Sequence, residues 1–419
     1  MMTGFCLQGG TGRAFPALHG LAGSGVARVT CRAVTGLFLT ALAATGGAAD
    51  IGPPRLVEAL RAQPDAVYTF VIGYRDGVDP QSARVSTATG PVRPIPLINA
   101  AVMTMRVADA FAVAAGADVL WVWYLHPDEA PTTVNVLGAL DRAVATMPLP
   151  NLANISLGPP SAFFRAEPEL DAPVPRALQA AADRGLIAVV AIGNQGEAAP
   201  GFVNPWSMAP AVISVGAWDH RTGGVWAGSS TGRRDRPEAW PDVVAPGVDV
   251  IGPWTSTIPK SDRQRAHDEG TPRFREVVAR KDWDAYTMMT GTSQATAVVS
   301  GAAAQVLRFV RGVIAEQGTQ PGQPLFELQA GPGRMGAQAA SGPRLTGTAT
   351  PREDGGVTFS YTLDVPWKLI KQILIDTAIP VAGVEPWEAG AGLVDPDHIR
   401  AQFGAFGPEP PQLLPMRVR

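Results

Sequence analysis

The alternation between short apolar segments and alanine-rich segments constrains the fold of this chain more than any other feature. It begins near residue 66 and continues through most of the sequence. Strands and helices that alternate along a chain favour a mostly parallel sheet covered by helices. The run from Ile187 to Ile192 contains no polar residue, as expected for a strand buried on both faces. We therefore predict an α/β fold with a mostly parallel sheet.

The predicted strands are short apolar runs: Val67–Gly73, Val119–Leu125, Leu152–Leu157, Leu186–Ile192, Ala211–Val215 and Asp242–Ala245. The predicted helices are longer and rich in helix formers: Ala108–Ala115, Val134–Thr146, Pro175–Arg184, Ser293–Val310 and Trp367–Thr377. We interpret two further stretches as insertions. Residues 256–283 are charged and irregular, and residues 318–364 are rich in glycine and proline. Within the second stretch, a hairpin is predicted from Leu345 to Leu363.

Composition excludes several classes of protein. The 419 residues carry a formal net charge of -3, with 17% charged and 46% hydrophobic residues. The chain is too apolar to be disordered, and it lacks the basic excess of a nucleic-acid-binding protein. Because Cys6 and Cys31 both precede the globular part, we expect neither a disulfide framework nor a cysteine metal site. We find no phosphate loop, dinucleotide motif or metal-binding histidine pair, and we predict no metal and no cofactor.

The N-terminal segment has the features of an export signal. Arg28 and Arg32 precede the apolar stretch Ala33–Ala44, and small residues follow as far as Ala49. This order is typical of a secretory signal peptide, and the apolar run is too short to span a bilayer comfortably. We therefore expect a secreted or periplasmic protein without a transmembrane segment.

A serine stands at the start of the helix predicted from Ser293 onward. Gly291 allows a tight turn before it, and the helix that follows consists of small residues. An oxygen at this end faces free backbone N–H groups and the positive end of the helix dipole. This environment favours the negative charge that develops in acyl transfer, although a plain serine N-cap gives the same sequence pattern.

Two further segments lie where the carboxyl ends of parallel strands meet. Asn194 occupies a glycine turn directly after the buried strand that ends at Ile192. The segment Ser156-Leu157-Gly158 closes an earlier strand. Clefts of open α/β sheets lie at this edge, so the Asn194 amide can point into one.

Together, and in this order, these segments resemble the subtilisin-like serine peptidases. The resemblance covers residues 154–301, and weaker matches follow at residues 365–378 and 390–395. It rests on Gly291-Thr292-Ser293 with Ala295 and Thr296, on the turn from Ala191 to Gly196, and on Val243–Gly247. It implies a three-layer α/β sandwich that hydrolyses peptide bonds in a peptide or protein substrate.

By this resemblance Ser293 is the nucleophile, and Asn194 donates to the oxyanion alongside the backbone N–H of Ser293. Ser156, Leu157 and Gly158 then line the substrate cleft and pair with an extended peptide. A serine hydroxyl is a poor nucleophile until a base takes its proton, so the family mechanism also needs a histidine held by an aspartate.

The sequence departs from the family at that base. The family's Asp-Ser/Thr-Gly turn and Gly-His-Gly-Thr-His run are both missing. Four histidines follow residue 49, and none opens a helix in a glycine context: His126, His220, His267 and His398. A carboxylate base, as in sedolisins, is equally unsupported, because the candidate carboxylates do not suit such a site: Asp141, Glu169 and Asp171.

Residues 50–127 allow two interpretations. In the first, Val71–Asp79 replaces the strand that carries the family's Asp, and residues 98–102 begin the helix that carries its His. Gly116–Trp123 is then the next strand of the same parallel sheet. In the second, Val67–Pro127 resembles the inhibitory prodomain of the family, and the Asp and His elements are missing. We favour the first because it keeps the parallel sheet complete.

The sequence thus predicts five parts. Residues 1–49 are the signal peptide and N-terminal extension, and residues 50–127 are the degenerate first half or prodomain-like part. Residues 128–317 form the subtilisin-like core, 318–364 the insertion with the hairpin, and 365–419 a C-terminal helix and tail. Two functions remain open: a serine peptidase homologue of impaired activity, or an inactive relative that binds a peptide or protein.

Overall fold

The structure is a computed structural model. It describes residues 54–80, 88–146, 152–236, 240–255, 257–318, 324–330, 344–362 and 365–403. The predicted signal peptide and both cysteines lie outside these described residues.

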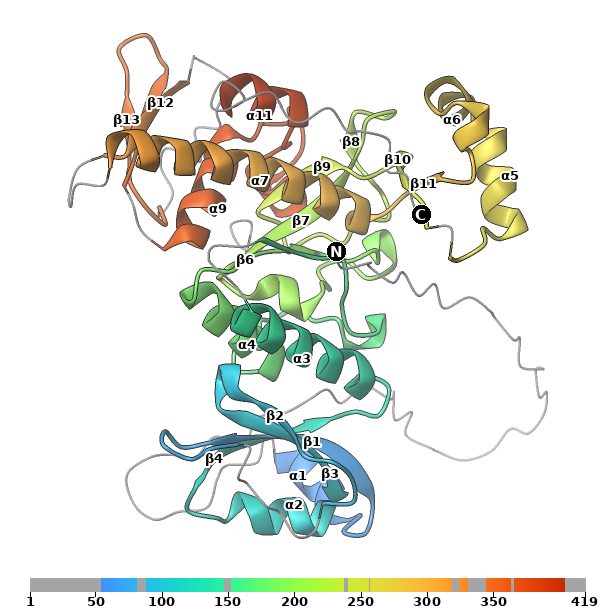
Figure 1. Cartoon of the computed structure of the whole chain (residues 1–419), viewed down its shortest axis with the longest axis vertical. Helices are drawn as coiled ribbons and strands as arrows, with labels where there is room; N and C mark the ends of the chain where they lie inside the picture. The colour runs from blue at the N-terminus through green and yellow to red at the C-terminus, as the bar shows by residue number, and fades with distance from the viewer. Residues whose placement is uncertain are drawn as a thin grey trace. The chain divides into compact units, whose positions relative to one another are not determined.

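A mostly parallel sheet lies at the centre of the fold (Figure 1). Its strands are β5 (Leu152–Ile155), β6 (Ile187–Ala191), β7 (Val212–Asp219), β8 (Gly224–Val225) and β9 (Val243–Pro246). β5, β6, β7 and β9 are parallel in the order β5-β6-β7-β9, and β8 pairs with β7 in the antiparallel sense. Every residue of β6 and β7 is buried, because both faces of the sheet are covered.

Helices cover the two faces of this sheet. They are α3 (Ala130–Thr146), α4 (Pro173–Asp183), α7 (Thr292–Gln317) and α9 (Pro366–Thr377). Successive side chains of a strand point to opposite faces. Accordingly Val189 of β6 packs in a core cluster with α7 and α9, whereas Val190 packs in another with α3 and α4. The prediction of a three-layer α/β sandwich is confirmed.

α7 is the one helix among the described residues that is long and apolar enough to cross a membrane by length and composition. The core helix of a soluble protein meets the same criteria. Ala295, Val299 and Ala303 of α7 are fully buried against the central sheet, so core packing accounts for the apolar character of this helix.

A second sheet precedes the central one and is entirely antiparallel, in the order β2-β3-β1-β4. Its strands are β1 (Val67–Tyr74), β2 (Arg93–Ile95), β3 (Ala100–Arg106) and β4 (Val119–Leu125). Two helices belong to the same region, α1 (Pro54–Arg61) and α2 (Val107–Ala114). A short 3-10 helix, Pro96–Ile98, leads into β3.

The first interpretation of residues 50–127 is therefore wrong. β1 pairs with β3 and β4 instead of the parallel sheet, and residues 100–106 form a strand where a helix was expected. The error has a physical cause. Val71 of β1 packs in the core cluster that includes α3 and α4, while Phe70 and Ile72 pack in the cluster that includes α2. A strand covered on both faces has the same unbroken apolar sequence in either kind of sheet.

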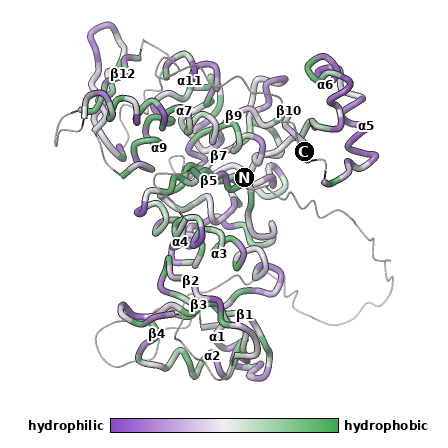
Figure 2. Tube along the Cα trace, viewed as in Figure 1, coloured by the Kyte–Doolittle hydropathy of each residue, from purple (hydrophilic) through white to green (hydrophobic). Residues whose placement is uncertain are grey.

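The charged insertion also differs from the prediction, because it contains two helices, α5 (Asp262–Gly270) and α6 (Pro272–Val277). Its base is the antiparallel pair β10 (Val250–Pro253) and β11 (Tyr286–Met289). In Figure 2 the trace of α5 is coloured almost entirely hydrophilic. α5 buries only Asp268 and so has no apolar stripe that sequence periodicity could detect.

The hairpin predicted from Leu345 to Leu363 is confirmed as β13 (Thr348–Pro351) and β14 (Val357–Tyr361). An unpredicted third strand, β12 (Phe326–Ala330), pairs with the other edge of β14. Two short helices follow α9, namely α10 (Pro386–Ala389) and α11 (Pro396–Phe403). Phe359 and Tyr361 of β14 join the core beside α7 and α9, which attaches this sheet to the central domain.

Candidate functional site

Ser293 lies in the first turn of α7 and is partly exposed. Its backbone N–H is one of the first-turn groups that have no acceptor within the helix. Gly291, which precedes the helix, has an extended backbone (φ 160°), so the expected tight turn does not explain this glycine. A Cβ atom there would lie 3.0 Å from Gln294 Oε1 and 3.3 Å from Asn194 Nδ2. Gly291 is therefore needed for close packing beside Asn194.

Asn194 lies in the turn that follows β6, and its side chain is oriented by Thr292. Its Oδ1 accepts hydrogen bonds from the Thr292 N–H (2.9 Å) and the Thr292 hydroxyl (2.8 Å). Gly193, with φ +117°, gives the turn a conformation that other residues rarely adopt. Because the oxygen of the amide is used in this way, its Nδ2 remains a donor, and no acceptor for it lies among the described residues. The exposed Asn194 thus presents an N–H donor next to the start of α7.

Ser156 follows β5 and connects that strand to the serine. Its hydroxyl donates to the Ser293 carbonyl at 2.9 Å, and the Ser293 hydroxyl points back to the Ser156 carbonyl at 3.5 Å. Leu157 is 45% exposed, and Gly158 is partly buried. The structure therefore brings together every site residue predicted from the sequence, at the carboxyl ends of β5 and β6 and the N-terminus of α7.

No histidine of the described chain contacts Ser293, whose hydroxyl has the Ser156 carbonyl as its only acceptor there. His126 accepts from the Asp128 N–H at 3.2 Å, and its ring packs on Phe163. His220 Nε2 lies 2.5 Å from Arg273.

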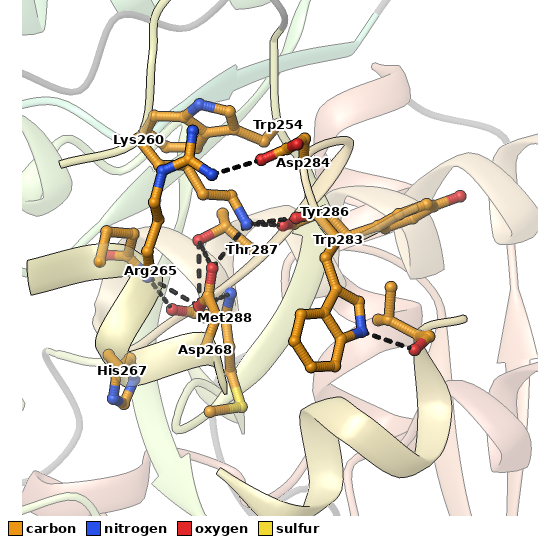
Figure 3. A network of polar contacts seen from close by, with 12 residues as sticks. Trp254, Lys260, Arg265, His267, Asp268, Trp283, Asp284, Tyr286, Thr287 and Met288 are labelled. Atoms are coloured by element: carbon orange, nitrogen blue, oxygen red, sulfur yellow. Dashed lines mark hydrogen bonds and ion pairs between the residues drawn. The ribbon is translucent and has the colours of Figure 1, made fainter. Parts of the chain in front are cut away.

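The other two histidines likewise make no hydrogen bond to Ser293 within the described structure. His267 is exposed on α5, where its side chain points away from the nearby polar network (Figure 3). His398 lies on α11.

The candidate carboxylates are likewise engaged elsewhere. Asp141 accepts from the Leu97 N–H at 2.8 Å, Glu169 binds Arg165, and Asp171 binds Arg176. Within the described ranges, no group of three or more His, Cys, Asp or Glu residues is placed to hold a metal ion.

The roles of two residues of the site were not predicted from the sequence. Thr292 links the Asn194 amide to the Gly193 N–H, which donates to the threonine hydroxyl at 3.3 Å. Asn204, only 1% exposed, donates from Nδ2 to the carbonyls of Leu157 (2.9 Å) and Ala191 (2.8 Å). It thereby joins the ends of β5 and β6. The signal for Asn204 was its place before Pro205, since it caps a short 3-10 helix there.

A buried carboxylate lies near the start of α3. Burial and, to a smaller extent, the nearby Glu169 carboxylate raise the pKa of Glu129 to about 7, although Arg165 opposes the shift. Arg165 binds Glu169 at 3.2 Å, and its own pKa is lowered by burial. Glu129 receives a long hydrogen bond of 3.4 Å from Thr133. This cluster affects stability, as argued below, and makes no contact with Ser293.

Comparison with known proteins was made after this geometry was established. The family model described as the Subtilase family matches residues 99–319, which is more than half of the chain. The serine protease AprX of Bacillus subtilis (strain 168) is 28% identical over 164 residues, covering 38% of this chain and 34% of AprX. The chain thus spans about a third of the length of this curated relative.

Among solved structures, the PatG macrocyclase in complex with peptide matches with a TM-score of 0.34 and 19% identity. That match covers 66% of this chain and 57% of PatG. A cold adapted subtilisin-like serine proteinase matches with a TM-score of 0.28 and 24% identity, covering 42% of this chain and 48% of the other. The family match includes α3, β5, β6, β7, β9 and the whole of α7, the elements that carry the site. The chain therefore belongs to the subtilase family of subtilisin-like peptidases.

Proposed function

We propose that this protein is a serine peptidase homologue in which Ser293 attacks the carbonyl carbon of a peptide bond. The developing oxyanion would accept hydrogen bonds from Asn194 Nδ2 and from the Ser293 N–H. The observation that carries this proposal is the double anchoring of Asn194 Oδ1 by Thr292. It holds the amide in place before substrate arrives, and such preorganised donors stabilise the transition states of acyl transfer.

The substrate is proposed to be an extended peptide or protein segment along Ser156, Leu157 and Gly158. Among the described strands, β5 pairs only with β6, so its other edge is available to a peptide strand. Main-chain pairing at such an edge provides affinity without requiring a particular sequence.

The activity is proposed to be impaired. A serine needs a base within about 2.6–3.2 Å, or one bridging water away. In the part of the chain that the structure describes, the Ser293 hydroxyl faces only a backbone carbonyl at 3.5 Å. What remains is oxyanion stabilisation and substrate binding, which supply a small fraction of the full rate.

A fluorophosphonate probe tests this function. Attack by Ser293 forms an Oγ–phosphorus bond and expels fluoride, so labelling reports an activated serine. We expect slow labelling of the wild type, none of Ser293→Ala, and labelling of Asn194→Ala that is about 100-fold slower. Intact-mass spectrometry gives the extent of labelling, with thermal unfolding to confirm that each variant is folded. Equal labelling of wild type and Ser293→Ala would contradict the assignment.

A second function is favoured by the same long Ser293–Ser156 contact. A catalytically inactive relative would keep the cleft to bind a peptide or protein. Two results together would support this binding function. The folded wild type would show no labelling, and a peptide library would identify ligands whose binding is lost when bulky side chains replace Gly158.

Residues 54–125 are proposed to form a prodomain-like unit. Its sheet packs on α3 and α4: the Leu97 N–H donates to Asp141 at 2.8 Å, and Trp121 stacks against Arg176 at 5.4 Å. We also propose export, with residues 1–49 removed. The N-terminal sequence and mass of protein recovered from the periplasm or medium test both ideas, because they show where the chain is cut.

A further inference from the structure

This inference rests on the proposed function and concerns the residue whose carbonyl Ser293 would attack. In an extended peptide, side chains point alternately toward and away from the surface on which the peptide lies. We place the inward direction, for a carbonyl oxygen that faces Asn194, between the segment Ser156-Leu157-Gly158 and the turn after β6, because Ser156 and Asn194 both contact the first turn of α7. What fills that space decides which side chain can enter it.

Phe164 reaches this space from the long loop between β5 and α4. A Cβ atom on Gly193 would lie 2.2 Å from Phe164 Cε2 and 2.9 Å from its Cζ, so the ring edge lies directly against the glycine. The ring is 8% exposed. Gly193 immediately precedes Asn194, which places Phe164 beside the oxyanion donor.

The backbone around Phe164 is held in position. The Phe164 carbonyl accepts from Arg165 Nη1 at 2.8 Å. Arg165 and Val203 exchange two backbone hydrogen bonds, each of 2.9 Å. The Phe164 ring is therefore carried by a backbone segment that is fixed by this pairing.

Asn204 lies against Gly158, in the other of the two segments. A Cβ atom on Gly158 would lie 3.0 Å from both Cγ and Nδ2 of Asn204. The amide is fixed by its bonds to the carbonyls of Leu157 and Ala191. Phe164 thus lies against Gly193 and Asn204 against Gly158, the glycines of the two segments between which the side chain would enter.

We infer that Phe164 is a specificity-determining residue that restricts the residue before the attacked bond to a small side chain, such as glycine or alanine. A large aromatic or aliphatic side chain would have to displace the Phe164 ring. Even one methylene group too many in a packed pocket costs about 10-fold or more in discrimination.

Peptide aldehydes test this inference without requiring a complete catalytic apparatus. The Ser293 oxygen adds to the aldehyde carbon, and the hydroxyl proton ends on the new hemiacetal oxygen, so no group leaves. Two probes are compared by calorimetry: acetyl-Ala-Ala-Ala-alaninal and acetyl-Ala-Ala-Ala-phenylalaninal. We expect wild type to bind the alaninal about 100-fold more tightly. Phe164→Ala should remove most of that preference, and Phe164→Leu should remove part of it.

Phe163→Ala is the matched control. Phe163 is 4% exposed in the same loop, but its ring packs on His126 at 5.2 Å instead of Gly193. The Phe163→Ala variant should lose about as much stability as Phe164→Ala, but it should keep the preference for the alaninal probe. Equal binding of both probes to wild type, or an equal change in both variants, overturns the role of Phe164. If neither probe binds folded wild type, the proposed function fails as well.

Discussion

Lys260→Met should destabilise the charged insertion by about 3–5 kcal/mol, because it leaves a buried carboxylate without its counter-ion. Lys260 and Asp268 form an ion pair of 2.7 Å, with side chains only 3% and 1% exposed. Lys260 also donates to the carbonyls of Trp283 (2.6 Å) and Tyr286 (Figure 3). One ammonium group thus joins α5 to the two segments that follow α6.

The carboxylate of Asp268 is equally well bound. Burial opposes its charge, but hydrogen bonds from Lys260, the Met288 N–H, Gln264 and Thr287 outweigh this effect and hold its pKa below the usual range. Without Lys260, water cannot readily replace the lost partner. We therefore expect α5 and α6 to open locally before the rest of the domain unfolds.

Hydrogen exchange across residues 257–289 and chemical denaturation would measure this effect. Arg265→Met is the control, because the Arg265–Asp284 pair has side chains 44% and 80% exposed. Breaking such a surface pair costs about 0–1 kcal/mol. The double variant Lys260→Met/Asp268→Leu should recover much of the stability, since it leaves no buried charge. A cost for Lys260→Met no larger than that of Arg265→Met would refute the prediction.

Raising the pH from 5 to 8 should destabilise the wild type by about 3 kcal/mol relative to Glu129→Gln. The pKa of Glu129 is raised by burial to about 7, above its ordinary value of 4.5. The folded state therefore holds a proton that the unfolded chain releases. The resulting stabilisation is complete below pH 4.5 and is lost as the pH rises through 7.

The surroundings of Glu129 favour this protonated form. The side chain is 9% exposed, and its Oε2 atom has no hydrogen-bond partner within the described structure. Arg165 is near, but Glu169 already binds it. Glutamine mimics the neutral acid and should remove the dependence on pH.

Urea denaturation at several pH values would test this prediction. Glu167→Gln is the control, because Glu167 is 52% exposed and pairs with Arg233 and Arg236 on the surface. It should keep the slope of the wild type between pH 5 and 8. Parallel stability curves for wild type and Glu129→Gln would show that Glu129 is already ionised in the folded protein at pH 5.

Much of the candidate site was predictable because its signals are local. A glycine before a small-residue helix pointed to Ser293, although Gly291 is extended and forms no tight turn, and a glycine turn after an apolar strand pointed to Asn194. β6 is buried on both faces, so its position followed from a short run without polar residues. These patterns depend on a few neighbouring residues, and the chain folds locally as they indicate.

Contacts between distant segments decided the rest. Thr292 orients Asn194 across 98 positions of sequence, and nothing in either segment alone specifies that hydrogen bond. The sequence-based prediction placed β1 in the wrong sheet. Hydrophobicity indicates that a strand is buried, but it does not identify the neighbouring strand. Phe164 lies against Gly193 only because the fold brings these two segments together. The sequence by itself determined the strands and helices of the central sheet and the glycine turn that carries Asn194, because those choices follow from local hydrophobic patterns and glycine conformation. Only the tertiary structure decided which strands pair, what holds the amide and what fills the cleft, because these depend on segments that meet only in the folded chain.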